Sequence, residues 1–324
     1  MALRDLLNPY FYGVLLRNYL YDKGIKKSKK VGVPVISIGN LSVGGTGKTP
    51  MVRFLVESLY KNYKIAVISR GYKRKTKGLK LVYSDGEVKL TLEEAGDEPY
   101  LLAKCFQRKG IRNAIIIVDE VRFRGAKFAV ENFGVNLIIL DDGFQHRAMA
   151  RDLDIVLLKK RDLKDALLPF GRLREPLKNL QRADAIVLSY QDVYPFEVSI
   201  RSKPVFKMYR TNWGVYDYSW KKIDIKELLR KEFIVFSGLG DNEQFLLSVK
   251  RLGIKIKKFL KFPDHYSYKN ASFDKEEFYL TTLKDWVKLG FRQKNIYFLD
   301  FDLKVERFKE WVIRTLKNYT RQAQ

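Results

Sequence analysis

Cysteine and histidine are scarce in this sequence. Cys105 is the only cysteine, and His146 and His265 are the only histidines among 324 residues. A lone cysteine excludes an intramolecular disulfide and a zinc site built from several cysteines. Cys105 lies in an apolar helical stretch, which is typical of a core residue. The chemistry must therefore be sought among carboxylates, basic residues and glycine-rich turns.

Long uncharged apolar runs are also missing. The sequence has no run of about 18 uncharged apolar residues, which is the length needed to span a bilayer. Asp5 and Arg17 interrupt the apolar N-terminal stretch, so we expect no secretory signal. Acidic residues are outnumbered, with 37 Asp and Glu against 62 Lys and Arg, which gives a net charge of +25. Such an excess favours an anionic partner: nucleic acid, an acidic membrane surface or a phosphorylated substrate.

The most specific pattern present is a glycine-rich turn at residues 42–49, between an apolar run at 33–38 and a helical run at 51–60. Backbone N–H groups of such a turn converge on phosphate oxygens, and the following helix adds partial positive charge. Lys48 would reach the β- and γ-phosphates, and the Thr49 hydroxyl would ligate Mg²⁺. Ser42 replaces the first glycine of the strict motif, and a turn that binds nothing is the alternative. The expected nucleotide-binding residues are Gly44, Gly45, Thr46, Gly47, Lys48 and Thr49.

Strand and helix patterns alternate through the chain, which predicts an α/β fold with crossover helices. We expect a P-loop NTPase domain with a mostly parallel sheet at 31–204 and a second, smaller α/β domain at 205–324. In the first domain, strands are expected at 35–38, 65–69, 114–118, 137–140, 155–158 and 185–188, with helices at 51–60, 98–106, 122–131 and 182–184. In the second, strands are expected at 233–236, 277–281 and 296–299, with helices at 242–251 and 306–319.

Residues 1–30 form a separate N-terminal segment. Asn8-Pro9 is typical of a helix start, aromatic and aliphatic residues follow at helical spacing, and a lysine-rich run occupies 26–30. An aromatic helix beside a polybasic segment suits an anionic membrane surface. A helix packed on the domain with a solvated lysine tail explains the same pattern.

Two pairs of acids stand at ends of expected elements. Asp141 and Asp142 end an apolar strand beside the phosphate loop, which is where P-loop enzymes hold magnesium. Asp97 and Glu98 stand at an expected helix start, where capping by Asp97 would explain them. The functional alternative is that one acid serves Mg²⁺ and the other a proton transfer.

His265 lies in a proline-containing connector, which makes it a candidate for an acid–base or orienting role. Arg122 begins an expected helix and could stabilise the charge of a transferring phosphoryl group. A surface histidine and a solvated helix charge are the respective alternatives.

Several blocks together resemble one family, the tetraacyldisaccharide 4'-kinases that phosphorylate lipid A precursors in Gram-negative bacteria. The resemblance begins with the loop at 39–50 and spans nearly the whole chain in order. It departs at Leu283, where the family usually has Glu, and at Gly238-Leu239-Gly240, where it usually has Gly-Ile-Gly. The other matching blocks are Ser69-Arg70-Gly71-Tyr72, Gly96-Asp97-Glu98-Pro99, Asp141-Asp142-Gly143-Phe144-Gln145-His146, residues 168–176, Asp264-His265 and residues 281–285.

The resemblance implies that ATP donates its γ-phosphoryl group to the 4'-hydroxyl of an acylated glucosamine disaccharide 1-phosphate. The family works peripherally on the cytoplasmic face of the inner membrane. By resemblance, Asp97 accepts the hydroxyl proton and His265 assists, which requires the second domain to close over the cleft. The implied roles are catalysis for Asp97, His265, Lys48 and Arg122; Mg²⁺ binding for Thr49, Glu98, Asp141 and Asp142; and substrate binding for Arg70, Gln145, Arg172 and Arg174.

Two other classes of protein share parts of this pattern. A switch-type P-loop ATPase would move a protein partner and have no small acceptor. A nucleic-acid-binding ATPase would explain the net charge of +25. The basic residues are spread rather than grouped in one module, so we expect no nucleic-acid partner and no obligate protein partner.

Overall fold

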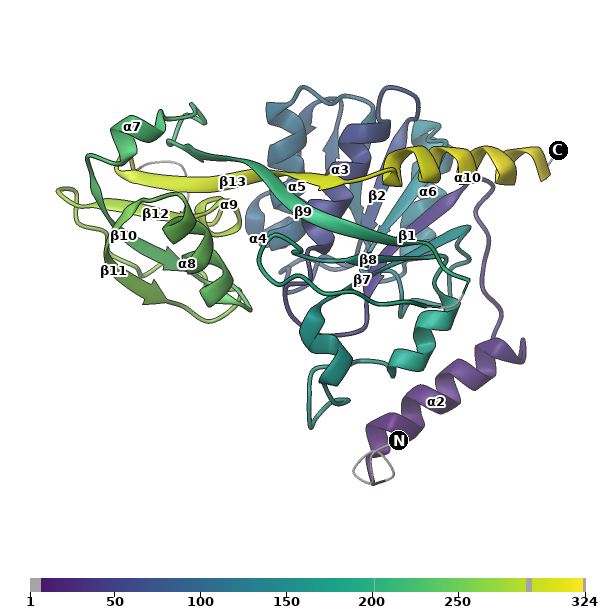
Figure 1. Ribbon diagram of the computed structural model, residues 1–324. Helices are drawn as coiled ribbons and strands as arrows, with labels where there is room; N and C mark the ends of the chain where they lie inside the picture. The colour runs from purple at the N-terminus through teal and green to yellow at the C-terminus, as the bar shows by residue number, and fades with distance from the viewer. Residues whose placement is uncertain (1–6, 201, 290–292, 323–324) are drawn as a thin grey trace. The chain divides into compact units, whose positions relative to one another are not determined.

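The chain forms two compact units in a computed structural model that describes residues 7–200, 202–289 and 293–322 (Figure 1). Unit 1 comprises Met1–Tyr209 and Leu303–Gln324, and unit 2 comprises Arg210–Asp302. The sequence placed residues 205–324 in one domain, whereas residues 303–324 group with unit 1 in the structure. The expected N-terminal segment 1–30 is part of unit 1, and its residues 1–6 lie outside the described ranges.

Unit 1 is built on a mostly parallel sheet with the strand order β9-β8-β7-β1-β6-β2-β5-β3-β4. All of the expected strands of this unit are confirmed. The pairs from β8 to β5 are parallel, and β3 and β4 join the edge in antiparallel orientation. The strands are β1 (Val35–Asn40), β2 (Ile65–Ser69), β3 (Lys80–Ser84), β4 (Glu87–Val88), β5 (Ala114–Val118), β6 (Leu137–Asp141), β7 (Leu153–Leu158), β8 (Ala185–Leu188) and β9 (Val205–Tyr216).

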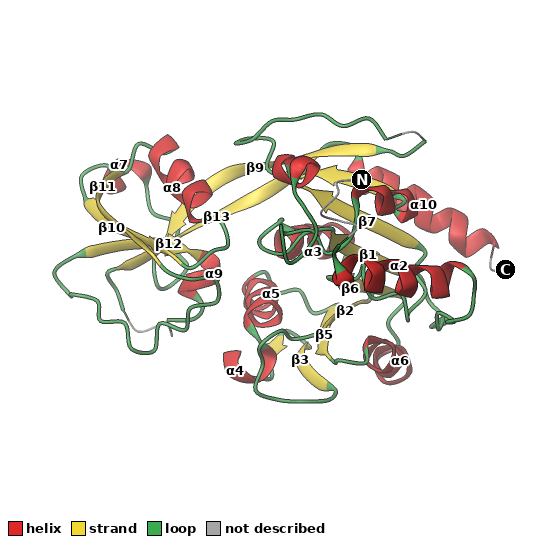
Figure 2. Ribbon diagram, turned by 90° about the horizontal axis from the view of Figure 1, so that it is seen from below, coloured by secondary structure: helices red, strands yellow, loops and turns green. Residues whose placement is uncertain are grey.

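Every residue of β1, β2, β5 and β6 is buried, because helices cover both faces of this sheet. Figure 2 shows α5 and α6 on opposite sides of β2 and β5. The helix expected at 182–184 is wrong: a 3₁₀ helix ends at Arg182, and Ala183 is extended. The helical elements are α2 (Pro9–Asp22), α3 (Lys48–Leu59), α4 (Leu92–Ala95), α5 (Asp97–Arg108), α6 (Arg122–Phe133), η1 (Lys160–Lys164) and η2 (Leu177–Arg182).

Unit 2 contains the parallel strands β11, β10, β12 and β13, in that order. Its core joins aromatic and aliphatic side chains of these strands and of α8, including Phe233, Phe245 and Leu280. Strands β9 and β13 have residues in both units. The elements are α7 (Ile225–Leu228), β10 (Glu232–Ser237), α8 (Asn242–Arg251), β11 (Lys255–Lys261), β12 (Phe278–Thr282), α9 (Leu283–Trp286) and β13 (Ile296–Val305).

The predicted N-terminal helix is present as α2. Asn8 caps it, because its side-chain oxygen accepts a hydrogen bond of 3.0 Å from the backbone N–H of Tyr10, and Pro9 fills the first turn. Phe11 and Val14 of α2 are buried, so one side of the helix packs on unit 1. Among the helices of the described ranges, none combines the length and apolar character needed to cross a bilayer.

The last helix, α10 (Phe308–Gln322), packs on unit 1 through an aromatic cluster. Phe308 is fully buried, and its ring centroid lies 5.0 Å from that of Phe206 and 6.5 Å from that of Phe54 on α3. This contact gives a physical reason for residues 303–324 to group with unit 1.

Truncating the Phe308 side chain tests whether residues 303–324 pack on unit 1. Phe308→Ala should lower the free energy of unfolding by about 3 to 5 kcal/mol, because it removes a fully buried ring and leaves a cavity. Lys309→Ala, at the exposed neighbouring position, should change it by less than about 0.5 kcal/mol. Urea unfolding followed by circular dichroism measures both values. Equal effects would contradict the packing.

Candidate active site

The phosphate loop joins β1 to α3, as the sequence predicted. Gly44 and Gly47 both have φ of 92°, a backbone conformation that side chains other than glycine disfavour. A Cβ atom added to Gly47 would also lie 2.9 Å from Met208 Cε. Lys48 and Thr49 form the first turn of α3, so their backbone N–H groups stand at a helix N-terminus.

Asp141 and Asp142 lie at the carboxyl end of β6, next to this loop. Ile38 of β1 pairs with Asp141 of β6, so the acids lie beside the strand that enters the loop. Asp142 has φ of 53°, a left-handed conformation that follows the end of the strand directly. The predicted placement of both acids is confirmed.

Asp142 is held by basic side chains. Lys48 Nζ lies 3.5 Å from Asp142 Oδ1, and Arg174 donates to both carboxylate oxygens at 2.8 and 2.9 Å. Burial works to raise the pKa of Asp142, but the charges of Lys48 and Arg174 outweigh burial and hold that pKa well below its usual range. Asp142 therefore stays ionised and fixes both cations beside the loop.

Asn40 links the same cations from the end of β1. Its side-chain oxygen accepts a hydrogen bond of 3.2 Å from Lys48 Nζ and another from Arg174 Nη2. Its side-chain amide donates to Ser42 O at 2.7 Å. Asn40 is fully buried, so it ties the loop backbone to both cations. No role for Asn40 was predicted from the sequence, although its position at the carboxyl end of β1 could have indicated one.

Asp141 has the opposite electrostatic character. It is buried, and Ser69 Oγ donates to its Oδ2 at 3.2 Å, while its Oδ1 has no hydrogen-bond partner within the described ranges. Burial, with the charges of Glu98 and Asp142, raises the pKa of Asp141 to about 7. The charges of Lys48 and Arg122 lower this pKa but do not outweigh burial and the two acidic neighbours.

A divalent cation fits this arrangement. Hard cations prefer carboxylate oxygens, and Mg²⁺ typically takes one or two carboxylates together with phosphate oxygens and water. No group of three or more His, Cys, Asp or Glu side chains in the described parts of the chain could hold a metal by itself. The unpartnered Asp141 Oδ1 is suited to a cation whose other ligands come from bound phosphates and Thr49.

Asp97 and Glu98 open α5. The residue that caps the helix is Gly96, with φ of 88°, and Asp97 is the first residue inside the helix. The capping explanation for Asp97 is therefore wrong, and no side-chain cap of α5 occurs within the described ranges. Glu98 lies close enough to Asp141 for its charge to raise the pKa of Asp141. Glu98 of one acidic pair thus lies near Asp141 of the other.

Arg122 is buried rather than solvated. Its Nη1 donates 2.7 Å to the backbone oxygen of Asp142, and only 6% of the residue is exposed. Burial is the largest cause that lowers the pKa of Arg122, and the charge of the nearby exposed Arg70 also works to lower the pKa values of Arg122 and His146. Burial is the main cause that lowers the pKa of His146, to about 4, so this histidine is neutral at pH 7.

The remaining predicted substrate residues lie along the loop. Gln145 Nε2 donates 2.9 Å to Asn40 O. The backbone oxygen of Arg172 accepts 2.8 Å from Val43 N, while the Arg172 residue itself is exposed. The structure thus brings Arg70, Gln145, Arg172 and Arg174 to the same part of unit 1 as Lys48 and Asp142.

His265 belongs to unit 2. It follows Asp264, whose Oδ1 lies 3.9 Å from His265 Nε2 and 3.1 Å from Lys284 Nζ. The backbone φ of His265 is 65°, so the loop presents this side chain from a left-handed conformation.

Sequence reasoning also missed contacts from the far end of the loop. Ser189, just after β8, donates 2.8 Å from its hydroxyl to Thr46 O. A Cβ atom added to Gly44 would lie 3.6 Å from Arg161 Nη2, so Arg161 stands beside the loop. Arg161 follows β7, which is next to β1 in the sheet, and Ser189 follows β8, one strand further; these positions at the carboxyl ends of strands are the signal that could have indicated both residues.

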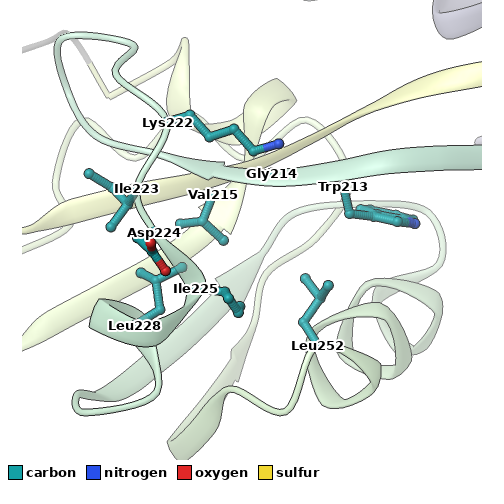
Figure 3. A pocket seen from close by; sticks show the side chains of 9 residues that line it. All are labelled: Trp213, Gly214, Val215, Lys222, Ile223, Asp224, Ile225, Leu228 and Leu252. Atoms are coloured by element: carbon teal, nitrogen blue, oxygen red, sulfur yellow. The ribbon is translucent and has the colours of Figure 1, made fainter.

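Unit 2 contains a separate pocket of about 510 Å³ (Figure 3). Mostly apolar side chains surround it, and Lys222 and Asp224 are the charged residues of the lining. The lining comprises Trp213, Gly214, Val215, Lys222, Ile223, Asp224, Ile225, Leu228 and Leu252. None of these is a predicted site residue, so the pocket is separate from the phosphate loop.

Comparison with known proteins connects this geometry to one family. Residues 2–317 match the family described as tetraacyldisaccharide-1-P 4'-kinase (LpxK). The chain is 49% identical over 310 residues to the tetraacyldisaccharide 4'-kinase of Aquifex aeolicus (strain VF5), which covers 94% of this chain and 96% of the relative. It is 38% identical over 291 residues to that of Koribacter versatilis (strain Ellin345), with 86% and 85% covered. The crystal structure of Aquifex aeolicus LpxK in complex with ATP is similar with a TM-score of 0.84 and 48% identity, over 95% of this chain and 96% of that chain.

The opposite pKa shifts of the two neighbouring acids predict opposite effects on stability. The pKa of Asp141 rises from 3.8 to about 7 on folding, so its ionisation costs stability as the pH rises through this range. In the protein free of nucleotide and metal, Asp141→Asn should remove a cost of about 2 kcal/mol or more at pH 8. The melting temperature should then rise by about 4 °C or more at pH 8 and change little at pH 4.

Asp142→Asn is the matched control. The pKa of Asp142 is lower in the folded chain than its ordinary 3.8, so its ionised form contributes stability above pH 4 that is lost as the pH falls further. Asp142→Asn should therefore lower the melting temperature at pH 8. Differential scanning calorimetry measures both variants, and shifts of the same sign would contradict the assignment.

Proposed function

The chain belongs to the tetraacyldisaccharide 4'-kinase family, and from that premise we propose that it transfers the γ-phosphoryl group of ATP to the 4'-hydroxyl of a tetraacyldisaccharide 1-phosphate. It is a phosphotransferase of the lipid A pathway, as its relatives are. The observation that carries the proposal is the convergence of Lys48, Asp141 and Asp142 beside the phosphate loop. Phosphoryl transfer needs little beyond such positioning and charge neutralisation.

The phosphates of ATP would lie against residues 44–49. The loop amides and the α3 N-terminus bind phosphate oxygens, and Lys48 neutralises charge on the β- and γ-phosphates. Because Asp142 and Asn40 already hold the Lys48 ammonium, its position is set before the nucleotide arrives. Such prior ordering lowers the entropic cost of binding and of reaching the transition state.

Magnesium would be held by Thr49 and Asp141, with Glu98 and Asp142 as the neighbouring acids. When bound, Mg²⁺ neutralises developing charge on the transferring phosphoryl group. The raised pKa of Asp141 supports this assignment, because a cation beside it would favour the ionised carboxylate.

Asp97 is the proposed base for the acceptor hydroxyl. It lies inside the first turn of α5, next to Glu98, and a carboxylate there can accept a proton while its neighbour serves the metal. We assign His265 the role of assisting this transfer. Buried Arg122 would stabilise charge on the phosphoryl group, and Arg70, Gln145, Arg172 and Arg174 would bind the phosphorylated acceptor.

The membrane assignment rests on α2. Its outward face exposes the apolar and aromatic side chains of Tyr12, Leu16 and Tyr19. The lysine-rich run at 26–30 follows, and the whole chain carries a net charge of +25. We infer a peripheral site on an anionic membrane surface, the cytoplasmic face of the inner membrane, where an acylated acceptor resides.

Transfer of label from γ-labelled ATP tests the proposed function. Wild-type protein with Mg²⁺ and detergent-solubilised tetraacyldisaccharide 1-phosphate should label the lipid. Lys48→Ala should lower the rate at least about 100-fold, because one preorganised cation is lost. Consumption of ATP without labelled lipid would contradict the proposal.

The proposed base has its own test. Asp97→Asn keeps the size of the side chain but removes its basicity, so kcat should fall by about 10²-fold or more while the affinity for MgATP stays within about twofold. Glu93→Gln on α4, an acid that pairs with Lys75 at 2.5 Å on the surface, is the matched control and should retain full activity. If Asp97→Asn keeps wild-type kcat, Asp97 is not the base.

Membrane binding by α2 can be measured with vesicles that contain phosphatidylglycerol. Leu16, which is 60% exposed, should insert its side chain, so Leu16→Ser should weaken binding by about tenfold. Leu247→Ser, at an exposed leucine of α8, should leave vesicle binding unchanged. Equal binding of both variants in co-sedimentation would exclude α2 as the membrane contact.

A further inference from the structure

Residues 172–175 run alongside the phosphate loop. The backbone N–H of Val43 donates 2.8 Å to Arg172 O, and the N–H of Arg174 donates 2.6 Å to Leu41 O. Ser42 and Leu173 form an antiparallel bridge between these hydrogen bonds. This segment is thereby held to the loop by its backbone, and the Arg174 side chain continues to Asp142.

The other side of this segment is held by α2. Tyr10 Oη donates 2.9 Å to the backbone oxygen of Arg174. The next residue, Glu175, is fully buried, and Arg17 and Asn18 of α2 donate to its carboxylate at 2.7 and 3.2 Å. The same helix therefore contacts two consecutive residues of the segment that bears Arg174.

Glu175 is also satisfied from its own segment. Arg182 Nη2 and Asn179 Nδ2 donate to Glu175 Oε2 at 2.8 and 2.6 Å. A buried carboxylate with partners on every side is rigid, since the loss of one partner leaves a charge uncompensated. Arg182 in turn stacks over the ring of Phe144, with its guanidinium carbon 4.3 Å from the ring centroid.

An apolar cluster joins the same pieces. Phe11 of α2 packs in one core with Leu41 before the loop, Leu173 beside Arg174 and Phe144 after Asp142. The polar contacts of Tyr10 and Glu175 are therefore made next to continuously packed apolar side chains. Movement of α2 cannot be absorbed by empty space and must act on the residues around Arg174.

We propose that Tyr10 and Glu175 are positioning residues, through which α2 holds Arg174 on Asp142 beside the phosphate loop. The helix is then a support of the phosphate site as well as a surface element. The consequence for the reaction rests on the proposed function, in which Asp142 and Lys48 arrange the phosphates. A helix that merely docks on unit 1 would contribute stability without any specific link to Arg174.

A double-mutant cycle separates these possibilities. Tyr10→Phe removes one hydroxyl and leaves the ring, so the variant should fold. In the wild-type background it should lower both kcat and the affinity for MgATP, the latter measured by calorimetry. The two losses combined should amount to about fivefold, the equivalent of one lost hydrogen bond. In the Arg174→Lys background the same change should have less than about a twofold effect, because the positioned group is gone.

Asp22→Asn is the matched control on the same helix. Asp22 Oδ1 forms a 2.7 Å ion pair with Arg147, away from residues 172–175, so it tests docking alone. Its effect on the two constants should be less than about twofold in both backgrounds. Glu175→Gln is the second probe of the support: it should lower kcat at least as much as Tyr10→Phe, again without additivity with Arg174→Lys.

The inference is wrong if the losses caused by Tyr10→Phe and Glu175→Gln are additive with the loss caused by Arg174→Lys. It is also wrong if Tyr10→Phe keeps the wild-type kcat and affinity for MgATP. The binding cycle uses MgATP alone, so it decides the positioning role even if wild-type protein fails to phosphorylate the lipid. In that case the proposed acceptor would be wrong while the link from α2 to Arg174 stands or falls on its own measurement.

Discussion

The carboxylate of Asp142 is the interaction on which the rest of the site depends. This carboxylate holds Lys48 of the loop and Arg174 of a distant segment in one place. The backbone oxygen of Asp142 also accepts a hydrogen bond from buried Arg122. Without this anion, three cations would repel one another at the end of the sheet. The parallel strand order places β1 and β6 side by side, so the fold brings the acid and the lysine together before any ligand binds.

Adjacent acids with opposite electrostatic character give the site its division of labour. Asp142 has its charge neutralised by Lys48 and Arg174, whereas at Asp141 burial and the acidic neighbours outweigh the charges of Lys48 and Arg122. The first acid organises cations, and under the proposed function the second would bind a cation that arrives with the nucleotide. Similar chemistry at consecutive residues thus serves two tasks because the surroundings of the two side chains differ.

Local patterns predicted the parallel strands of unit 1, the loop and the places of both acidic pairs, because β-branched runs and glycine-rich turns carry their structure in a few adjacent residues. They did not predict β9, whose burial pattern is irregular, or β11, where lysines face solvent along the strand. Nor could they predict that Arg122 is buried, that Gly96 rather than Asp97 caps α5, or that Asn40 and Glu175 bind distant partners. Those facts depend on tertiary contacts between segments far apart in sequence. The roles of Asp97, His265 and the substrate residues stay predictions.

Under the proposed function, one site in unit 1 directs the γ-phosphoryl group to a sugar hydroxyl rather than to water. The most direct test is the ratio of lipid-bound phosphate, located by ³¹P nuclear magnetic resonance, to ADP formed in the same reaction. A 4'-kinase should give a ratio near one, with the new phosphomonoester on the 4' position of the disaccharide. A ratio near zero, with ADP released and the lipid unchanged, would contradict it.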